Sequence, residues 1–195
     1  MYLFFDTETT GLPKHWGAPV TDLNNWPRLV QLAFVLTDAA GSVLQQTDII
    51  VKPDGYTIPV EASRIHRITQ EKAEAEGIPL SDAMELFRDA LVKSKYLVAH
   101  NISFDEKIMG CEFLRLGKDN PMPTRKGLCT MKESTNYCAI PGARGGYKWP
   151  KLQELHMRLF KTTFDEAHNA AADIGATVKC FFAMKEKHIA FTTNN

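Results

Sequence analysis

The chain has 195 residues, of which 44% are hydrophobic and 24% are charged, so we expect one compact domain with a sizeable core. This composition excludes bulk disorder and needs neither a disulfide nor a structural metal for stability. The 23 Lys and Arg residues balance the 23 Asp and Glu residues, which excludes a generally cationic coat for nucleic acid, so any polyanion must be bound locally.

The four cysteines form no C-x-x-C pair, which argues against zinc ribbons and thioredoxin chemistry and favours reduced thiols. The apolar run before Asp6 is too short for the core of a signal peptide, and no later segment approaches the length of a membrane span. We therefore expect a cytoplasmic protein.

Short apolar or β-branched runs predict strands, and apolar residues at helical spacing predict helices. The expected strands cover residues 2–5, 29–36, 43–51 and 96–99, with Asp38, Gly41 and Ser42 forming a turn between the second and third. One helix begins after Ser81 as N-cap and ends at about Val92. A second carries the stripe Ile108, Met109, Phe113 and Leu116 and ends at Gly117, and two more cover residues 152–160 and 170–187. Strands that first form hairpins and then alternate with helices indicate an α/β domain with a mixed sheet.

Two segments have no assigned role. Residues 13–28, with Trp16 and Trp26, form a long connection that is either a lip for the substrate or simple packing. Residues 118–150 are rich in proline and glycine and hold six Lys or Arg residues against two acids. This basic segment is either a solvated surface loop or a rim that guides phosphates.

Pairs of carboxylates after strands point to metal chemistry. Asp6 and Glu8 are two residues apart on an extended chain, which places both side chains on one face. Two anions this close either share a proton or bind a cation, and oxygen ligands favour Mg²⁺ or Mn²⁺ over zinc. Asp105 follows another strand, and His168 lies five residues before Asp173, in the loop that precedes the last helix, where Asn169 could serve as the cap.

The motifs DTETTGL, HNISFD and HNAAAD stand in an order and at intervals that resemble the DnaQ-like 3′ to 5′ exonucleases with the DEDDh signature. This family includes proofreading subunits of bacterial polymerases. The resemblance runs from about Tyr2 to Phe182, and IPVEASRIHRIT, LCT and YKWPKLQEL agree with it. It implies an RNase H-like fold with a central five-stranded mixed sheet flanked by helices. It also implies that residues 1–195 are a single exonuclease domain, with a core of about 2–187 and a short C-terminal tail.

The resemblance implies a role for each motif residue. Asp6, Glu8, Asp105 and Asp173 would hold two divalent ions, Mg²⁺ or Mn²⁺, and His168 would be the general base. The substrate pocket would be lined by Thr9, Thr10, Leu12, His66, Asn101 and Phe104. Phe104 and Leu12 could equally belong to the core, and Asn101 to a structural turn. Arg67 departs from the family, whose members often have glycine there, and this puts the local loop in doubt.

The first functional hypothesis is a metal-dependent 3′ to 5′ exonuclease that releases nucleoside 5′-monophosphates from single-stranded DNA ends, with a polymerase or repair protein as a possible partner. An exoribonuclease that trims RNA is the alternative within the same class, because the 2′-hydroxyl contact that separates the two is not visible in the motifs. From a different class, the chain could be a catalytically silent accessory module that only binds nucleic acid.

Overall fold

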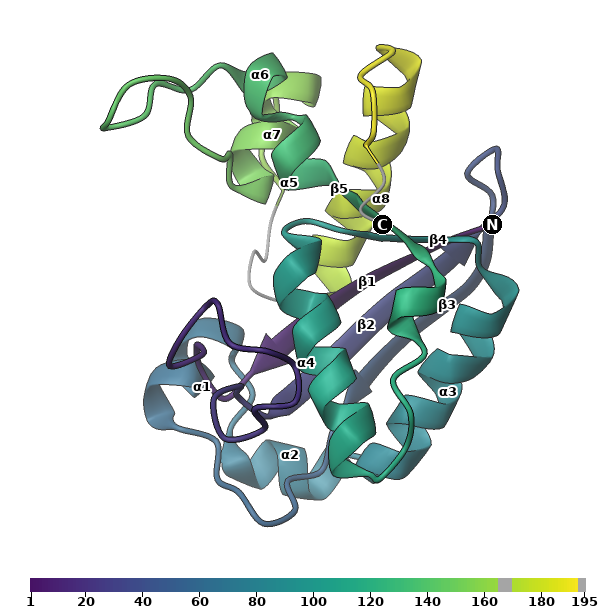
Figure 1. Ribbon diagram of the computed structural model, residues 1–195, viewed down its shortest axis with the longest axis vertical. Coiled ribbons are helices and arrows are strands. Elements are labelled where there is room, and N and C mark those ends of the chain that lie inside the picture. Colours follow the sequence, from purple (N-terminus) through teal and green to yellow (C-terminus); the bar gives the residue numbers. More distant parts are fainter. Residues whose placement is uncertain (165–169, 193–195) are drawn as a thin grey trace.

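The fold is built on one mixed sheet, seen in a computed structural model that describes residues 1–164 and 170–192 (Figure 1). The strands are β1 (Tyr2–Thr9), β2 (Leu29–Thr37), β3 (Val43–Ile50), β4 (Tyr96–Ala99) and β5 (Lys126–Cys129). Their order across the sheet is β3-β2-β1-β4-β5. β1 pairs antiparallel with β2 and parallel with β4, and β4 is parallel to β5. The carboxyl ends of β1, β4 and β5 therefore meet at one edge, where sites in α/β proteins gather.

Helices cover both faces of this sheet. In chain order they are α1 (Val60–His66), α2 (Gln70–Glu76), α3 (Leu80–Lys93), α4 (Ile102–Arg115), η1 (Met122–Thr124), α5 (Thr130–Glu133), α6 (Thr135–Cys138), α7 (Leu152–Phe160) and α8 (Ala170–Glu186). α3 and α4 lie on one face, and α8 crosses the other (Figure 1). Each face has its own apolar core, and the side chains of β1 contribute to both.

The alternation of side chains along β1 determines which of them lie on each face of the sheet. Leu3 and Phe5 enter the core beneath α3 and α4, whereas Phe4 packs against α8. Continuing the same alternation, Asp6 and Glu8 lie on the α8 face. The expectation that these two acids share a face is thus confirmed, although the strand continues through the motif to Thr9 and does not stop at Phe5.

The mixed five-stranded sheet is confirmed, but several local predictions change. Ser81 is not the N-cap of α3, because the helix starts two residues earlier than expected, at Leu80 with Pro79 as N-cap, and the Ser81 hydroxyl donates to Asp82. The turn after β2 forms as expected, with Asp38 Oδ1 accepting from the amides of Ala40 and Ser42 (both 2.9 Å). Two short helices of seven residues each, α1 and α2, were not predicted from the sequence.

The basic segment 118–150 is more structured than a loop, since it contains η1, β5, α5 and α6. Several of its cations already have partners within the protein. Lys118 pairs with Glu85, Lys148 with Glu154, and the Arg125 guanidinium donates to the carbonyl of Leu91. These contacts favour a structural role for those three side chains over the guidance of phosphates.

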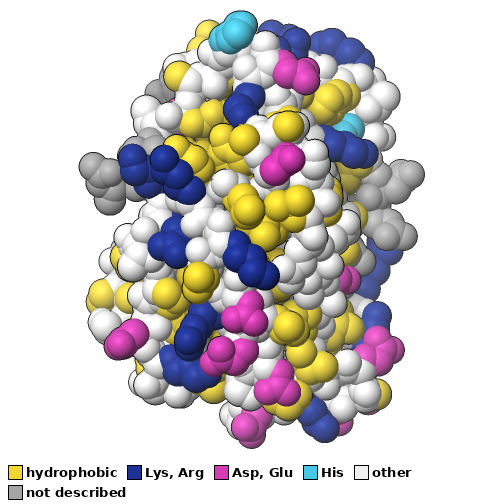
Figure 2. Space-filling model, turned by 90° about the vertical axis from the view of Figure 1, so that its right-hand side faces the viewer, with side chains coloured by type: hydrophobic (Ala, Val, Ile, Leu, Met, Phe, Trp, Pro, Cys, Tyr) yellow, Lys and Arg dark blue, Asp and Glu magenta, His cyan; other side chains and the backbone are white. Residues whose placement is uncertain are grey.

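The surface in Figure 2 has Lys and Arg side chains intermixed with Asp and Glu, with hydrophobic side chains between them. This pattern agrees with the balanced net charge of the chain. Among the described residues, no helix is both long and apolar enough to cross a membrane.

Candidate active site

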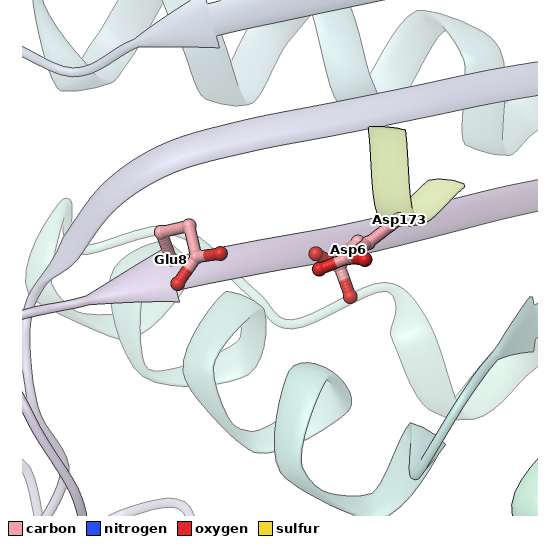
Figure 3. Close-up of side chains that lie close together, drawn as sticks. All are labelled: Asp6, Glu8 and Asp173. Atoms are coloured by element: carbon pink, nitrogen blue, oxygen red, sulfur yellow. The ribbon is translucent and has the colours of Figure 1, made fainter. Parts of the chain in front are cut away.

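Three carboxylates meet on the α8 face of the sheet. Asp6 and Glu8 come from β1, and Asp173 comes from the first turn of α8 (Figure 3). One oxygen of each lies within 4.8 Å of one oxygen of the other two. Residues that are almost 170 positions apart in the sequence therefore form one compact group of oxygen ligands.

Asp105 approaches from the other side. It lies in the first turn of α4, is buried, and its Oδ1 accepts the amide of Thr7 (3.1 Å) and the hydroxyl of Thr7 (2.8 Å). Thr7 stands between Asp6 and Glu8 in β1 but points to the opposite face. One strand thus carries two of the acids and fixes a third.

Three of the acids are costly to ionise in the metal-free fold. Burial raises the pKa of Asp6 well above its usual value, and the charges of Asp105, Asp173 and Glu8 raise it further. Burial, with Asp173 and Asp105, raises the pKa of Glu8 to about 8. The pKa of Asp105 rises to about 7 because of burial, although the hydrogen bonds from Thr7 oppose this. Such a group either holds protons or binds a cation, and its oxygen donors fit a hard divalent ion.

The predicted base, His168, and its neighbour Asn169 lie outside the described residues. Their predicted roles as base and helix cap stay predictions. Asp173 is described, and it stands in the first turn of the helix that follows them.

The predicted pocket residues beside the acids are held by local hydrogen bonds. The Thr9 hydroxyl donates to the carbonyl of Gly11 (2.7 Å), and Thr10 Oγ1 accepts the amide of Arg28 (2.9 Å). His66 is buried, and its Nδ1 accepts the amide of Ile68 (3.1 Å), which leaves the proton on Nε2. Burial lowers the pKa of His66, and its buried Nε2 has no hydrogen-bond partner among the described residues. Burial and the bond from Ile68 therefore favour the neutral imidazole.

The other three pocket candidates differ in exposure. Leu12 is 73% exposed and is therefore not a core residue. Phe104 is partly buried against the core beneath α4, and its ring also contacts the ring of Trp16, with centroids 5.8 Å apart. Asn101 adopts a left-handed conformation (φ 76°) before α4, and its carbonyl accepts the amide of Phe104 (2.9 Å), as in the structural-turn alternative.

Two residues with clear positions near the site were not singled out as candidates. One is Thr7, whose place in the middle of DTETTGL was the available signal. The other is His100, which lies half-buried between β4 and the segment before α7. Its Nε2 donates to the carbonyl of Pro150 (3.0 Å), so Nδ1 is the acceptor that faces Thr130 Oγ1 (3.0 Å).

The sheet thus brings Asp6, Glu8 and Asp173 into one group of oxygen ligands, with Asp105 near enough to raise the pKa of Asp6. A family model, RNase_T, described as exonuclease, matches residues 3–181. The chain therefore belongs to this exonuclease family, and the resemblance to the DnaQ-like exonucleases is confirmed.

Relatives agree with this assignment. DNA polymerase III of the PolC type from Streptococcus pyogenes serotypes M2 and M5 is 29% identical over 191 residues. The match covers 96% of this chain, which spans only 12% of the relative's length. Among solved structures, Escherichia coli exonuclease I in complex with a dA16 oligonucleotide has a TM-score of 0.74 at 21% identity, covering 95% of this chain and 40% of that one. Exonuclease I from Methylocaldum szegediense has a TM-score of 0.75 at 18% identity, with the same coverage. At this level of identity these structures show the shared fold.

Proposed function

We propose that the chain is a metal-dependent 3′ to 5′ exonuclease that releases nucleoside 5′-monophosphates from single-stranded DNA ends. The observation that carries the proposal is the convergence of Asp6, Glu8 and Asp173, with Asp105 close enough to raise the pKa of Asp6. Membership of an exonuclease family supports it.

The four carboxylates would hold two divalent ions, Mg²⁺ or Mn²⁺. Bound ions supply positive charge that stabilises the attacking and leaving oxygens of an in-line displacement at phosphorus. The chain's own residues prepare the group: Thr7 orients Asp105, and burial makes Asp6 and Glu8 costly to ionise until a cation arrives.

His168 would accept the proton of the attacking water, as its place in HNAAAD implies. The terminal nucleotide would lie against the backbone of Thr9 and Thr10, the imidazole of His66 and the ring of Phe104. Leu12, the exposed last residue of DTETTGL, would contact the sugar or base, and Asn101 would orient the start of α4. Contacts of this kind bind one nucleotide with little discrimination between bases.

DNA is the favoured substrate because the similar proteins are a DNA polymerase and an exonuclease crystallised with DNA oligonucleotides. Association with a polymerase is part of the same proposal, since the relative carries its matching segment within a much longer chain. RNA trimming remains the alternative, and a silent binding module is disfavoured because all four acid positions are filled.

The test is a time course on matched DNA and RNA strands labelled at the 5′ end, with Mg²⁺, Mn²⁺ or EDTA. The proposal predicts a metal-dependent ladder that shortens from the 3′ end, faster on DNA, with nucleoside 5′-monophosphates as the released product. Strands labelled at the 3′ end should lose the label in the first step. Faster shortening of the RNA strand would show that RNA is the preferred substrate. If folded protein leaves both strands intact, the proposed exonuclease activity is rejected.

A further inference from the structure

The segment 13–28 is built as a rigid part of the molecule. Asn25 is buried, and its side chain both accepts the amide of His15 (2.7 Å) and donates to the carbonyl of His15 (3.0 Å). Arg115 of α4 donates to the carbonyls of Leu23 (2.6 Å) and Trp26 (2.7 Å). Polar groups that are satisfied in this way fix the path of the segment against α4 (Figure 1).

This rigid segment nevertheless holds an indole in the solvent. Trp16 is 55% exposed, while Lys107 of α4 donates to its carbonyl (3.1 Å) and fixes the backbone at that point. Single exposed hydrophobic side chains are common on protein surfaces, so the significance of Trp16 rests on what its ring contacts. Packing alone does not explain its position, because Trp26 in the same segment is buried and performs that role.

The neighbour of the indole links it to the first turn of α4, which also carries Asp105. Its ring contacts the ring of Phe104, and Phe104 directly precedes Asp105 in the chain. The two rings are tilted by 46° with centroids 5.8 Å apart, so Trp16 and Phe104 form one aromatic contact at the start of α4, the helix that carries Asp105. Lys14 and His15, both exposed, precede Trp16 and add donors for a phosphate chain.

We infer that Trp16 stacks on the second base from the 3′ end of the bound strand, while Phe104 contacts the terminal base. The inference rests on the proposed function. The segment 13–28 would then serve substrate binding. Its Trp16 indole would hold the strand one nucleotide behind the bond that is cut. Stacking on an aromatic face accepts any base, which suits an enzyme that degrades a strand of any sequence.

The test couples the indole to one base. Single-turnover rates are measured against protein concentration for Trp16→Ala, Trp16→Phe and wild type, on strands with an intact or an abasic second position. We expect Trp16→Ala to raise the protein concentration needed for half-maximal rate by roughly 5- to 100-fold on the intact strand and by less than about twofold on the abasic strand. Trp16→Phe should recover most of the loss. Equal losses on both strands, or no loss on the intact one, would overturn the inference.

Two controls separate the possible failures. Trp149→Ala removes another exposed indole, which lies in the segment between α6 and α7, and it should show no coupling to the second base. Coupling there of the same size would overturn the assignment to Trp16. If wild type degrades strands and Trp16→Ala equals it, only this inference fails. If wild type degrades nothing, the proposed function fails. In that case the binding of the strand in EDTA is compared between Trp16→Ala and wild type, and equal affinities would reject the stacking as well.

Discussion

Thr7 donates two hydrogen bonds to the same carboxylate oxygen of Asp105, one from its amide and one from its hydroxyl. Because Thr7 lies between Asp6 and Glu8 in β1, a single strand positions acids on both of its faces. The spacing of the whole group therefore depends on β1, the central strand of the sheet. This is a stiff support for side chains that must stay close despite their repulsion.

We expect Thr7→Val to lower the free energy of unfolding by about 1–3 kcal/mol, because a buried hydrogen bond to a carboxylate is lost at nearly constant volume. The variant should also raise the pKa of Asp105 further and so weaken the binding of Mn²⁺. Urea unfolding and Mn²⁺ titration check the two effects. Thr7→Ser keeps the hydroxyl and should stay closer to wild type. A Thr7→Val protein with unchanged stability and Mn²⁺ affinity would remove Thr7 from the site.

The acid cluster predicts how pH acts on the metal-free protein. The pKa of Glu8 is raised to about 8, so the folded state holds a proton that the unfolded chain has lost. This contribution to stability is complete below the unfolded-state pKa and disappears as the pH rises through about 8. In EDTA, Glu8→Gln should therefore match wild type near pH 5 and exceed its melting temperature near about pH 9.

In Mn²⁺ the melting temperature of wild type should exceed that of Glu8→Gln, because the ion stabilises the wild-type carboxylates and binds the variant more weakly. Comparing two proteins at each pH cancels the histidines that titrate in the same window. If the difference in melting temperature between them does not change with pH, then Glu8 is ionised in the metal-free fold, contrary to the account.

His100 predicts an opposite dependence on pH. Burial lowers its pKa to about 4, so the folded state binds fewer protons than the unfolded chain between this value and the usual one. Its contribution is present above about pH 6.5 and is lost as the pH falls toward 4. His100→Gln should be less stable at neutral pH, because the bonds to Pro150 and Thr130 change, yet should lose less on acidification. Urea unfolding at a series of pH values measures both slopes, and equal slopes would contradict the assignment.

Arg67 offers a test of the backbone next to the pocket. It ends α1 in the left-handed region (φ 62°), which costs a non-glycine residue about 1–2 kcal/mol. Arg67→Gly relieves this cost but adds flexibility to the unfolded chain, so we expect a gain of about 0.5–1 kcal/mol. Arg67→Ala is the matched control, since it removes the same side chain and keeps the strained φ. If both variants unfold at the same urea concentration, the left-handed backbone is not the source of the effect.

Local patterns predicted the parts of the fold that depend on burial. The helix over residues 152–160 has the predicted bounds, and the four predicted strands all form within a few residues of their expected ends. In β1, β2 and β4 the apolar residues face a core, whereas β3 is mostly exposed and is held by its pairing with β2. The helices α1 and α2 could not be predicted from the sequence, because each is too short for a repeating apolar stripe. The contact between Thr7 and Asp105 was also out of reach, since it joins residues 98 positions apart across the sheet. The candidate acids could be recognised in the sequence because their residue types and spacing suit metal binding. The contact between the rings of Trp16 and Phe104 could not, because it depends on the tertiary structure.

The most direct measurement compares single-turnover cleavage of a 5′-labelled DNA strand by wild type, Asp6→Asn and Asp89→Asn in Mg²⁺. Asp6 belongs to the acid cluster, whereas Asp89 is an exposed residue of α3 and controls for the loss of one charge. The account predicts that Asp6→Asn cuts at least about 10²-fold more slowly, since a ligand of the metal group is lost, while Asp89→Asn equals wild type. An Asp6→Asn protein that shortens the strand at the wild-type rate would show that the cluster is not the catalytic centre.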